Sequence, residues 1–279
     1  MKKYYQYLAC AIFPLIVAAA SAYGQEPTPD RVVVPFSDPA RPGLFKASLM
    51  NGGMTIKGYE GKEVIIEARV RPEKPQKYEK SGKKTLGLRR LEITSTGLSV
   101  EEDDNEMSVS TESMNRTVDL TIQIPKNTSL KLSCLNDGDI KVEGINGEIE
   151  VNNTNGAVTL TNISGSVVAH ALNDDVIVTF VKITPDKSMS FSSLNGDIDV
   201  TFPPDLKAKV KMKTDNGDVY SDFDIKLEAA TNRMEEDARK EGGKYRLKVE
   251  KAMFGLISGG GPEMQFATYN GDIYIRKGK

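Results

Sequence analysis

Carboxylate pairs are the side chains of this sequence that come closest to a catalytic arrangement. They are Asp174-Asp175, Asp197 with Asp199, and Asp215 with Asp218. Two carboxylates can serve as the acid and the nucleophile or base of glycoside hydrolysis. These aspartates recur, however, at the corner positions of a short repeat, and aspartate is a common turn residue. We therefore assign no catalytic residue and expect the chain not to be an enzyme.

His170 is the only histidine, and no triad can be built around it from the sequence. It occupies a repeat position that elsewhere holds Glu143, Asn152 and Thr161, so we expect it on a solvent-facing strand surface. The glycine-rich stretch Ser258–Glu263 lacks the Gly-Lys-Ser/Thr ending of a phosphate-binding loop. We interpret it as a tight turn between strands.

Aspartate beside glycine also raises the question of calcium, which nine-residue Gly/Asp repeats can bind between coils. That motif needs aspartate two places after its second glycine, and here the place holds an apolar residue such as Ile140 or Ile149. The aspartates that follow glycine directly are Asp139, Asp197, Asp218 and Asp272. We interpret them as hydrogen-bonding turn residues and predict no metal site and no cofactor.

One stretch carries a column of lysines. Lys207, Lys209, Lys211 and Lys213 alternate with apolar residues, which places four cations on one face of a strand. Such a face could attract anionic polysaccharide or lipid headgroups. We favour the alternative that the lysines protect an outer strand from edge-to-edge aggregation.

A nine-residue repeat positions most of these side chains. Residues 135–179 form five consecutive units, such as LNDGDIKVE and GINGEIEVN. Asn-Gly or a similar pair marks a sharp corner in each unit. The sixth and eighth positions are apolar and, being two residues apart, share one face of a strand. They are Ile140, Ile149, Val158, Val167 and Val176, and Val142, Val151, Leu160, Ala169 and Val178.

Stacking is what allows such short strands to bury their apolar faces, and stacked copies form a β-solenoid. Ile145 and Ile163 share the second repeat position and lie eighteen residues apart, as do Thr154 and Leu172. Two units therefore form one coil of about 18 residues, in a range of about 18–22. The predicted fold class is all-β: a single-stranded β-solenoid, β-helix- or β-roll-like, of short strands with Asn-Gly corners.

The pattern continues outside the central repeat. Further units begin at Leu49, Ser193, Thr214 and Thr268, and alternating strands are expected at Val118–Ile124, Leu206–Met212 and Tyr245–Val249. Charged insertions lie near 71–90, 101–115 and 225–243. We expect the first two to be protruding loops and the third to contain a short helix over 228–240. At the corners, Gly147 and Gly196 are expected to adopt positive φ.

The N-terminus has the pattern of a secretory signal peptide. Lys2 and Lys3 precede an uncharged apolar run, Leu8–Ala20, which ends in the small-residue site Ala20-Ser21-Ala22. The alternative is a retained membrane anchor. We expect residues 1–22 to be removed and residues 23–279 to form one domain without a transmembrane segment.

Net charge and cysteine count limit the classes of partner and the cellular compartment that we expect. Removing two lysines leaves 37 − 2 = 35 basic against 39 acidic residues, a formal charge of −4, which does not suggest a nucleic-acid binder. Only Cys134 remains after cleavage, so no intramolecular disulfide can form. An exported domain without disulfides suits a protected compartment. We therefore expect an exported protein, located in the periplasm or at the bacterial cell surface, or secreted.

The chain resembles the bacterial "putative-adhesin" domain family, which comprises exported β-solenoids largely of unknown function. The similar stretches are VPFSDPARPGLFKASLMNGGMTIKGYEGKEVIIEARV, the NGDI and NGEI units, and SGGGPEMQFATYNGDIYI. The resemblance implies a β-solenoid and transfers no catalytic, cofactor or metal residue. The charged insertion between Ile225 and Gly243 departs from the family's compact pattern.

These observations favour a non-enzymatic, exported β-solenoid that acts as an adhesin-like binding or structural module of the bacterial envelope. Its partner stays open between an envelope polysaccharide and a membrane protein. One alternative is an envelope-stress or signalling accessory protein that contacts a membrane partner. A carbohydrate-active enzyme is the less favoured alternative.

Overall fold

The structure is a computed structural model that describes residues 29–72, 95–112, 116–228, 233–237, 245–249 and 252–279, the short ranges 233–237 and 245–249 as backbone only. All regular elements in these ranges are strands, so the all-β prediction is confirmed. The described residues include no helix long and apolar enough to cross a membrane. The predicted signal peptide and most of the insertion near 71–90 lie outside the described residues.

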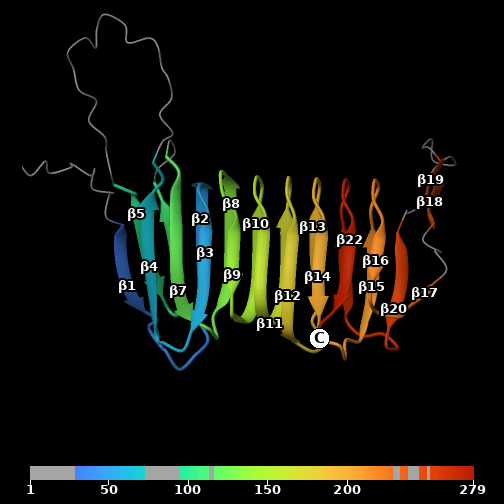
Figure 1. The fold of residues 1–279 in the computed structure, drawn as a ribbon, viewed down its shortest axis with the longest axis horizontal. Coiled ribbons are helices and arrows are strands. Elements are labelled where there is room, and N and C mark those ends of the chain that lie inside the picture. The colour runs from blue at the N-terminus through green and yellow to red at the C-terminus, as the bar shows by residue number, and fades with distance from the viewer. Residues whose placement is uncertain (1–28, 73–94, 113–115, 229–232, 238–244, 250–251) are drawn as a thin grey trace, which may run out of the picture.

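Twenty of the described strands join in one continuous mixed sheet that is folded into two layers (Figure 1). The first layer contains, in spatial order, β1 (Asp30–Pro35), β4 (Glu63–Val70), β7 (Val118–Pro125), β3 (Met54–Tyr59), β9 (Ile140–Glu143), the start of β11 (Val158–Ala171), β12 (Val176–Ile183), β14 (Ile198–Phe202), β22 (Ile273–Lys277) and β16 (Val219–Ser221).

The second layer packs against the first, and β11 belongs to both. Its strands are, in spatial order, β5 (Leu98–Asp103), β6 (Glu106–Thr111), β2 (Leu44–Asn51), β8 (Ser129–Asn136), β10 (Asn146–Asn153), the end of β11, β13 (Met189–Ser193), β21 (Glu263–Ala267), β15 (Ala208–Lys213), β20 (Met253–Ile257) and β17 (Ile225–Glu228). A separate hairpin pairs β18 (Arg233–Asp237) with β19 (Tyr245–Val249).

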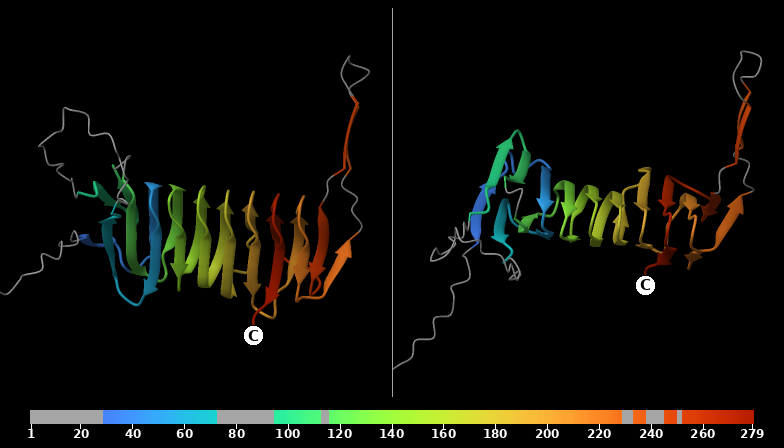
Figure 2. Two further views of the ribbon diagram at one scale, coloured as in Figure 1. Left: turned by 45° about the horizontal axis from the view of Figure 1, so that its top comes forward. Right: turned by 90° about the horizontal axis from the view of Figure 1, so that it is seen from above.

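Each central coil contributes one strand to each layer, and its register confirms the predicted period. Val158 lies beside Ile140 on one side and Val176 on the other, and each pair is eighteen residues apart. The next coil is wider, because Val176 pairs with Ile198, twenty-two residues on. Coils of 18 to 22 residues are therefore stacked by parallel pairing along one axis (Figure 2).

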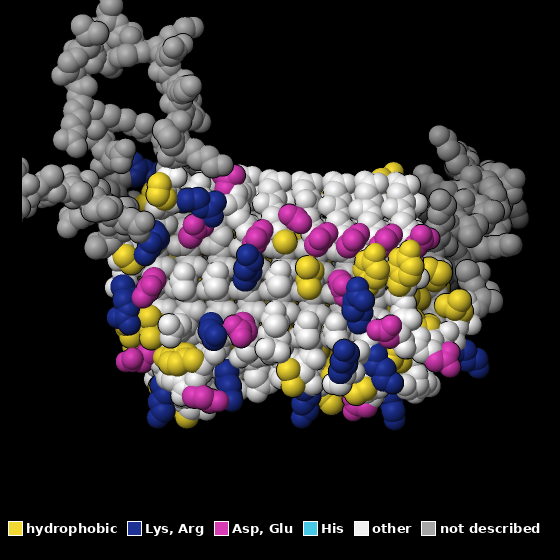
Figure 3. Space-filling model, in the orientation of Figure 1, with side chains coloured by type: hydrophobic (Ala, Val, Ile, Leu, Met, Phe, Trp, Pro, Cys, Tyr) yellow, Lys and Arg dark blue, Asp and Glu magenta, His cyan; other side chains and the backbone are white. Residues whose placement is uncertain are grey.

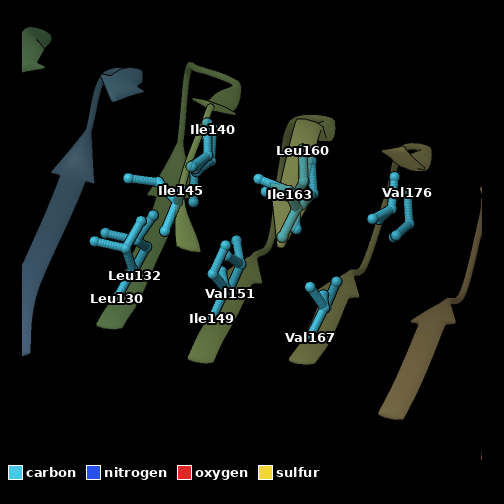
Figure 4. Close-up of a cluster of buried hydrophobic side chains, with 14 of the residues drawn as sticks. Leu130, Leu132, Ile140, Ile145, Ile149, Val151, Leu160, Ile163, Val167 and Val176 are labelled. Carbon is cyan, nitrogen blue, oxygen red and sulfur yellow. The ribbon is translucent and has the colours of Figure 1, made fainter. Parts of the chain in front are cut away.

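The core is the space between the two layers. All ten apolar side chains at the sixth and eighth repeat positions are buried there, and neighbouring coils place them in contact (Figure 4). Phenylalanines continue this core toward the C-terminal coils, where Phe191 and Phe266 stack with ring centroids 5.2 Å apart. The apolar ladder is therefore the main source of stability, because burial removes its surface from water.

The order of coils in space differs from their order in the chain at both ends. The coil of β2 and β3 lies between that of β6 and β7 and that of β8 and β9. The C-terminal coil, β21 and β22, lies between the coil of β13 and β14 and the coil of β15 and β16 (Figure 1). A solenoid that winds in sequence order therefore describes only the part from β8 to β14.

Two local predictions are wrong. Residues 101–111 are not a loop but part of the β5–β6 hairpin, which turns at Asp104 and Asn105 with positive φ and buries Met107 and Val109. The described part of the helix expected over 228–240 is strand instead, since residues 225–228 pair with β20 and residues 233–237 pair with β19. In both segments, cross-strand pairing outweighs the high local charge.

The corner glycines are required for a different reason from the one predicted. Gly147 and Gly196 do not have positive φ. The neighbouring coil instead approaches too closely for a side chain. A Cβ on Gly196 would lie 2.3 Å from the carbonyl oxygen of Asp174, and one on Gly147 would lie 2.7 Å from that of Thr128. Stacking of the corners, rather than the turn conformation, excludes a side chain at these two places.

Candidate functional site: an acidic tyrosine face

Two polar ladders mark one corner of the stacked coils. In the first, asparagine side chains hydrogen-bond from coil to coil, with Nδ2 of one residue donating to Oδ1 of the next at 2.7–3.3 Å. In spatial order they are Asn51, Asn136, Asn155, Asn173, Asn195, Asn270 and Asn216. The ladder runs through the inserted C-terminal coil without a break. It therefore fixes corner register rather than offering a binding group.

Aspartates form the second ladder on the first layer. Oδ1 of Asp175 accepts the backbone N–H of Asp197 at 2.7 Å, Asp197 accepts that of Asp272 at 2.8 Å, and Asp272 accepts that of Asp218 at 2.8 Å. Asp139 accepts the N–H of Ala157 in the same way. The predicted hydrogen-bonding role is confirmed for Asp139, Asp197 and Asp272, although the bonds join neighbouring coils rather than closing single turns. Figure 3 shows the resulting row of acidic side chains across this layer.

Two tyrosines stack immediately beside the acidic row. Tyr274 of β22 and Tyr220 of β16 are direct neighbours in register. Their ring centroids are 5.1 Å apart, and their planes differ by 10°. The Tyr274 hydroxyl donates to Oδ2 of Asp272 at 3.0 Å. Tyr220 is 48% exposed and belongs to the last strand of the layer, so part of its ring is available to a partner.

The side chain of Arg276 contacts both an aromatic ring and a carboxylate of this surface. Arg276 places its guanidinium carbon 5.0 Å from the Tyr274 ring centroid, a cation–π contact. Its Nε also donates to both carboxylate oxygens of Asp199, at 2.7 and 2.9 Å. We call Asp199, Asp218, Tyr220, Asp272, Tyr274 and Arg276 the tyrosine face. Three carboxylates and one guanidinium make its formal charge negative.

The pKa shifts agree with a negative local field. The pKa of Tyr220 is raised, chiefly by the charge of Asp218 and then by that of Asp272. The pKa of Tyr274 is raised mainly by its hydrogen bond to Asp272. The pKa of Arg276 is raised mainly by its hydrogen bond to Asp199. A surface of this kind favours cations and hydrogen-bond donors over anions.

Of the residues singled out from the sequence, Asp199, Asp218 and Asp272 lie in the tyrosine face. The others lie elsewhere or have structural roles. His170 faces outward on the second layer, as predicted, with Nδ1 2.9 Å from the Ser192 hydroxyl oxygen. Asp174 and Asp175 serve the corner, Asp174 through its own Oδ1 and the next backbone N–H. Residues 258–260 form the predicted turn between β20 and β21. Among the described residues, no cluster of histidine, cysteine or carboxylate side chains could hold a metal ion.

The interpretation of the lysine column is wrong. Its strand, β15, is not an edge, because it pairs with β20 on one side and β21 on the other. Lys211 packs over the Phe254 ring at 5.6 Å, and Lys213 lies 3.8 Å from a carboxylate oxygen of Asp215. These lysines therefore cannot protect an outer strand.

Sequence reasoning missed the tyrosine face. A signal was present, because the units NGDVYSD and NGDIYIR both carry tyrosine two places after aspartate, on the outward side of the strand. The sequence did not predict that these two units are neighbours in space, because Tyr220 and Tyr274 lie 54 residues apart (274 − 220). Only the insertion of β22 beside β16 brings them together.

The fold is that of an all-β protein of stacked coils, and the tyrosine face lies on its outer surface. Residues 134–252 match the family model described as Toastrack DUF4097. A solved structure named a putative cell adhesion protein, from Clostridium sporogenes, is similar at 15% identity and a TM-score of 0.43, covering 90% of this chain and 100% of that chain. One named a putative adhesin, from Bacteroides fragilis, has 10% identity and a TM-score of 0.39, covering 91% and 100%. No curated protein matches the chain.

Proposed function

We propose that this chain is a non-enzymatic, exported binding module of the bacterial envelope and that the tyrosine face is its main contact surface. The secretory pattern of the N-terminus supports export. The stacked coils support binding, because the core fixes the inward positions and leaves the outward ones free to vary. The matched domain of unknown function, over residues 134–252, is compatible with this role.

The stacked tyrosine pair, in which Tyr220 is exposed and Tyr274 half-buried, carries the proposal. Isolated apolar side chains on a surface need no explanation, but two stacked aromatic rings beside a row of carboxylates form a specific chemical surface. Tyrosine offers a large, stiff contact area with a polar tip, and for this reason it is enriched in interfaces. The carboxylates of this face are engaged with neighbouring groups, because Asp199 accepts from Arg276 and Asp272 accepts from the Tyr274 hydroxyl and the backbone N–H of Asp218. This engagement supports a binding role over a catalytic one.

The test is capture from native envelope extract by the immobilised mature chain. We expect a saturable component that is retained by the wild-type chain and lost by the double variant Tyr220→Ala and Tyr274→Ala. Tyr269→Ala is the matched control, because Tyr269 is 49% exposed but lies outside the face. His170→Ala should also leave capture unchanged.

Two results would contradict the proposed function. One is equal capture by the wild-type chain and the double tyrosine variant. The other is turnover of an envelope glycan that is abolished by His170→Ala or by changing Asp174 and Asp175 to asparagine. The second result would favour the carbohydrate-active enzyme instead.

A further inference from the structure

The stacked coils end unevenly next to the tyrosine face. β15 and β16 form the same coil, but the second layer continues past it with β20 and then β17. In the first layer, β16 pairs only with β22 within the described residues. Two strands of the second layer therefore have no described strand opposite them. We call this step, bounded by β16, β20 and β17, the notch.

No described strand pairs with the open side of β16, so the backbone groups on that side are available for hydrogen bonding. The carbonyl of Asp218 accepts from the N–H of Ile273 at 2.9 Å, and the N–H of Asp222 donates to the carbonyl of Ile275 at 3.0 Å. Alternate residues of a strand direct these groups to the same side. The backbone groups of Val219 and Ser221 therefore point away from β22, toward the notch. An exposed edge of this kind is a template for one more strand.

Apolar side chains line the floor of the notch. Leu227 pairs beside Gly255, and Met253 pairs beside Met212, which is buried in the core. Both side chains thus point toward the interlayer space, yet Leu227 is 63% exposed and Met253 is 42% exposed. Among the described residues, no strand of the first layer lies opposite these two side chains.

The outer side of the notch has the opposite chemistry. Tyr220 stacks on Tyr274 with one face of its ring, and the other face lies on the side of the open edge. Asp218 is two residues away on the same face of the strand. In β22, Arg276 lies two residues after Tyr274 and packs on its ring. In β16, the residue two places after Tyr220 is Asp222, so no arginine covers the Tyr220 ring from this position. A strand added here would meet an aromatic ring and carboxylates outside, and apolar side chains inside.

We propose that the notch binds an extended strand of a partner polypeptide in which apolar side chains alternate with arginine or lysine. The backbone of this strand would pair with Val219 and Ser221, its apolar side chains would cover Leu227 and Met253, and its cations would lie over Tyr220. Addition of a strand to a sheet edge is an established mode of peptide recognition. β22 is an internal precedent, because it lies between β14 and β16 with Ile273 and Ile275 inward and Arg276 outward.

This inference rests on the proposed binding function and names the class of partner. The probe is a labelled ten-residue peptide of alternating isoleucine and arginine, titrated against the mature chain and followed by fluorescence anisotropy. A peptide of the same composition in two blocks tests the strand pattern, and an alternating isoleucine–glutamate peptide tests charge. We expect the alternating arginine peptide to bind at least about tenfold more tightly than either control.

Variants separate the three contacts. Ser221→Pro should reduce affinity at least about tenfold, because proline is tolerated on an edge but removes the open N–H, whereas Ser221→Ala should not. Tyr220→Ala should reduce it about two- to fivefold, the scale of one exposed cation–π contact, and Tyr269→Ala should not. Leu227→Asp should reduce it at least about tenfold by placing a carboxylate on the apolar floor.

The other occupants are outcomes of the same experiment. If replacing residues 229–251 with a short Gly-Ser linker raises affinity more than about tenfold, this chain's own segment occupies the notch and the inference is wrong. If the chain forms a dimer that Ser221→Pro abolishes, a second copy is the occupant and the inference is again wrong. Failure of every peptide to bind, with envelope capture still dependent on Tyr220, would reject the strand but keep the proposed function.

Discussion

Placing a carboxylate inside the apolar ladder gives the sharpest test of the core. Val158 is fully buried and lies between Ile140 and Val176 in register. Val158→Asp would therefore leave a carboxyl group with no polar partner. An aspartate has an ordinary pKa of about 3.9, about three pH units below 7. Keeping its carboxyl protonated at pH 7 therefore costs about 4 kcal/mol, at about 1.36 kcal/mol per unit. Loss of the valine's burial adds about 2 kcal/mol.

The penalty depends on pH with a definite sign. Burial raises the pKa of the introduced carboxyl in the folded state, so the folded state holds one more proton than the unfolded state at neutral pH. Stability relative to wild type must then fall as pH rises above the unfolded value of about 3.9. We expect a loss of about 6 kcal/mol at pH 7 that shrinks to about 2–3 kcal/mol at pH 4, measured by urea unfolding at each pH.

Thr159→Asp is the matched control, because Thr159 is the next residue and faces outward beside Lys141. It should cost less than about 1 kcal/mol. Equal losses for the two variants, or a Val158→Asp penalty that does not change with pH, would refute the assignment of inward and outward faces.

Three further predictions concern the corners, the aspartates and the cysteine. Gly196→Val should lower the free energy of unfolding by at least about 2 kcal/mol in a urea melt, because its Cβ would lie 2.3 Å from the Asp174 carbonyl oxygen. A loss below about 0.5 kcal/mol would show that the corner can open. Millimolar calcium should leave Tm unchanged, because the ladder aspartates already accept backbone N–H groups; a rise of several degrees that a chelator reverses would show a calcium site. Cys134 is buried, and its Sγ–H donates to the Gly52 carbonyl. Burial raises the pKa of this thiol to about 11. A thiol reagent at pH 8 should therefore label Cys134 only after unfolding. Rapid labelling of the native chain would contradict this burial.

The sequence was sufficient for the coil but not for the order of coils. The eighteen-residue spacing of Ile145 and Ile163 is a local pattern, and it correctly predicted the length of the central coils. The units at Ser193, Thr214 and Thr268 share that pattern equally, so nothing local says which of them are neighbours. Their order follows from how the C-terminal coil completes the core between two earlier coils.

The tyrosine face was not predicted from the sequence, because it also depends on the order of the coils. Tyr220 and Tyr274 are unremarkable as separate outward residues, and they become a stacked pair only through the insertion of β22. The same limit explains the error on the lysines, because β15 would be an outer strand if the chain ended its winding there. Long-range pairing, rather than residue preference, decided both outcomes.

Tyrosine footprinting tests the central claim most directly. The mature chain would be exposed to a tyrosine-selective label with and without saturating envelope extract, and modification read residue by residue by mass spectrometry. Tyr220 and Tyr269 are almost equally exposed, at 48% and 49%, so each serves as the reference for the other. We predict that the extract protects Tyr220 and leaves Tyr269 unchanged. Protection of Tyr269 with no change at Tyr220 would contradict the assignment of the tyrosine face as the binding surface.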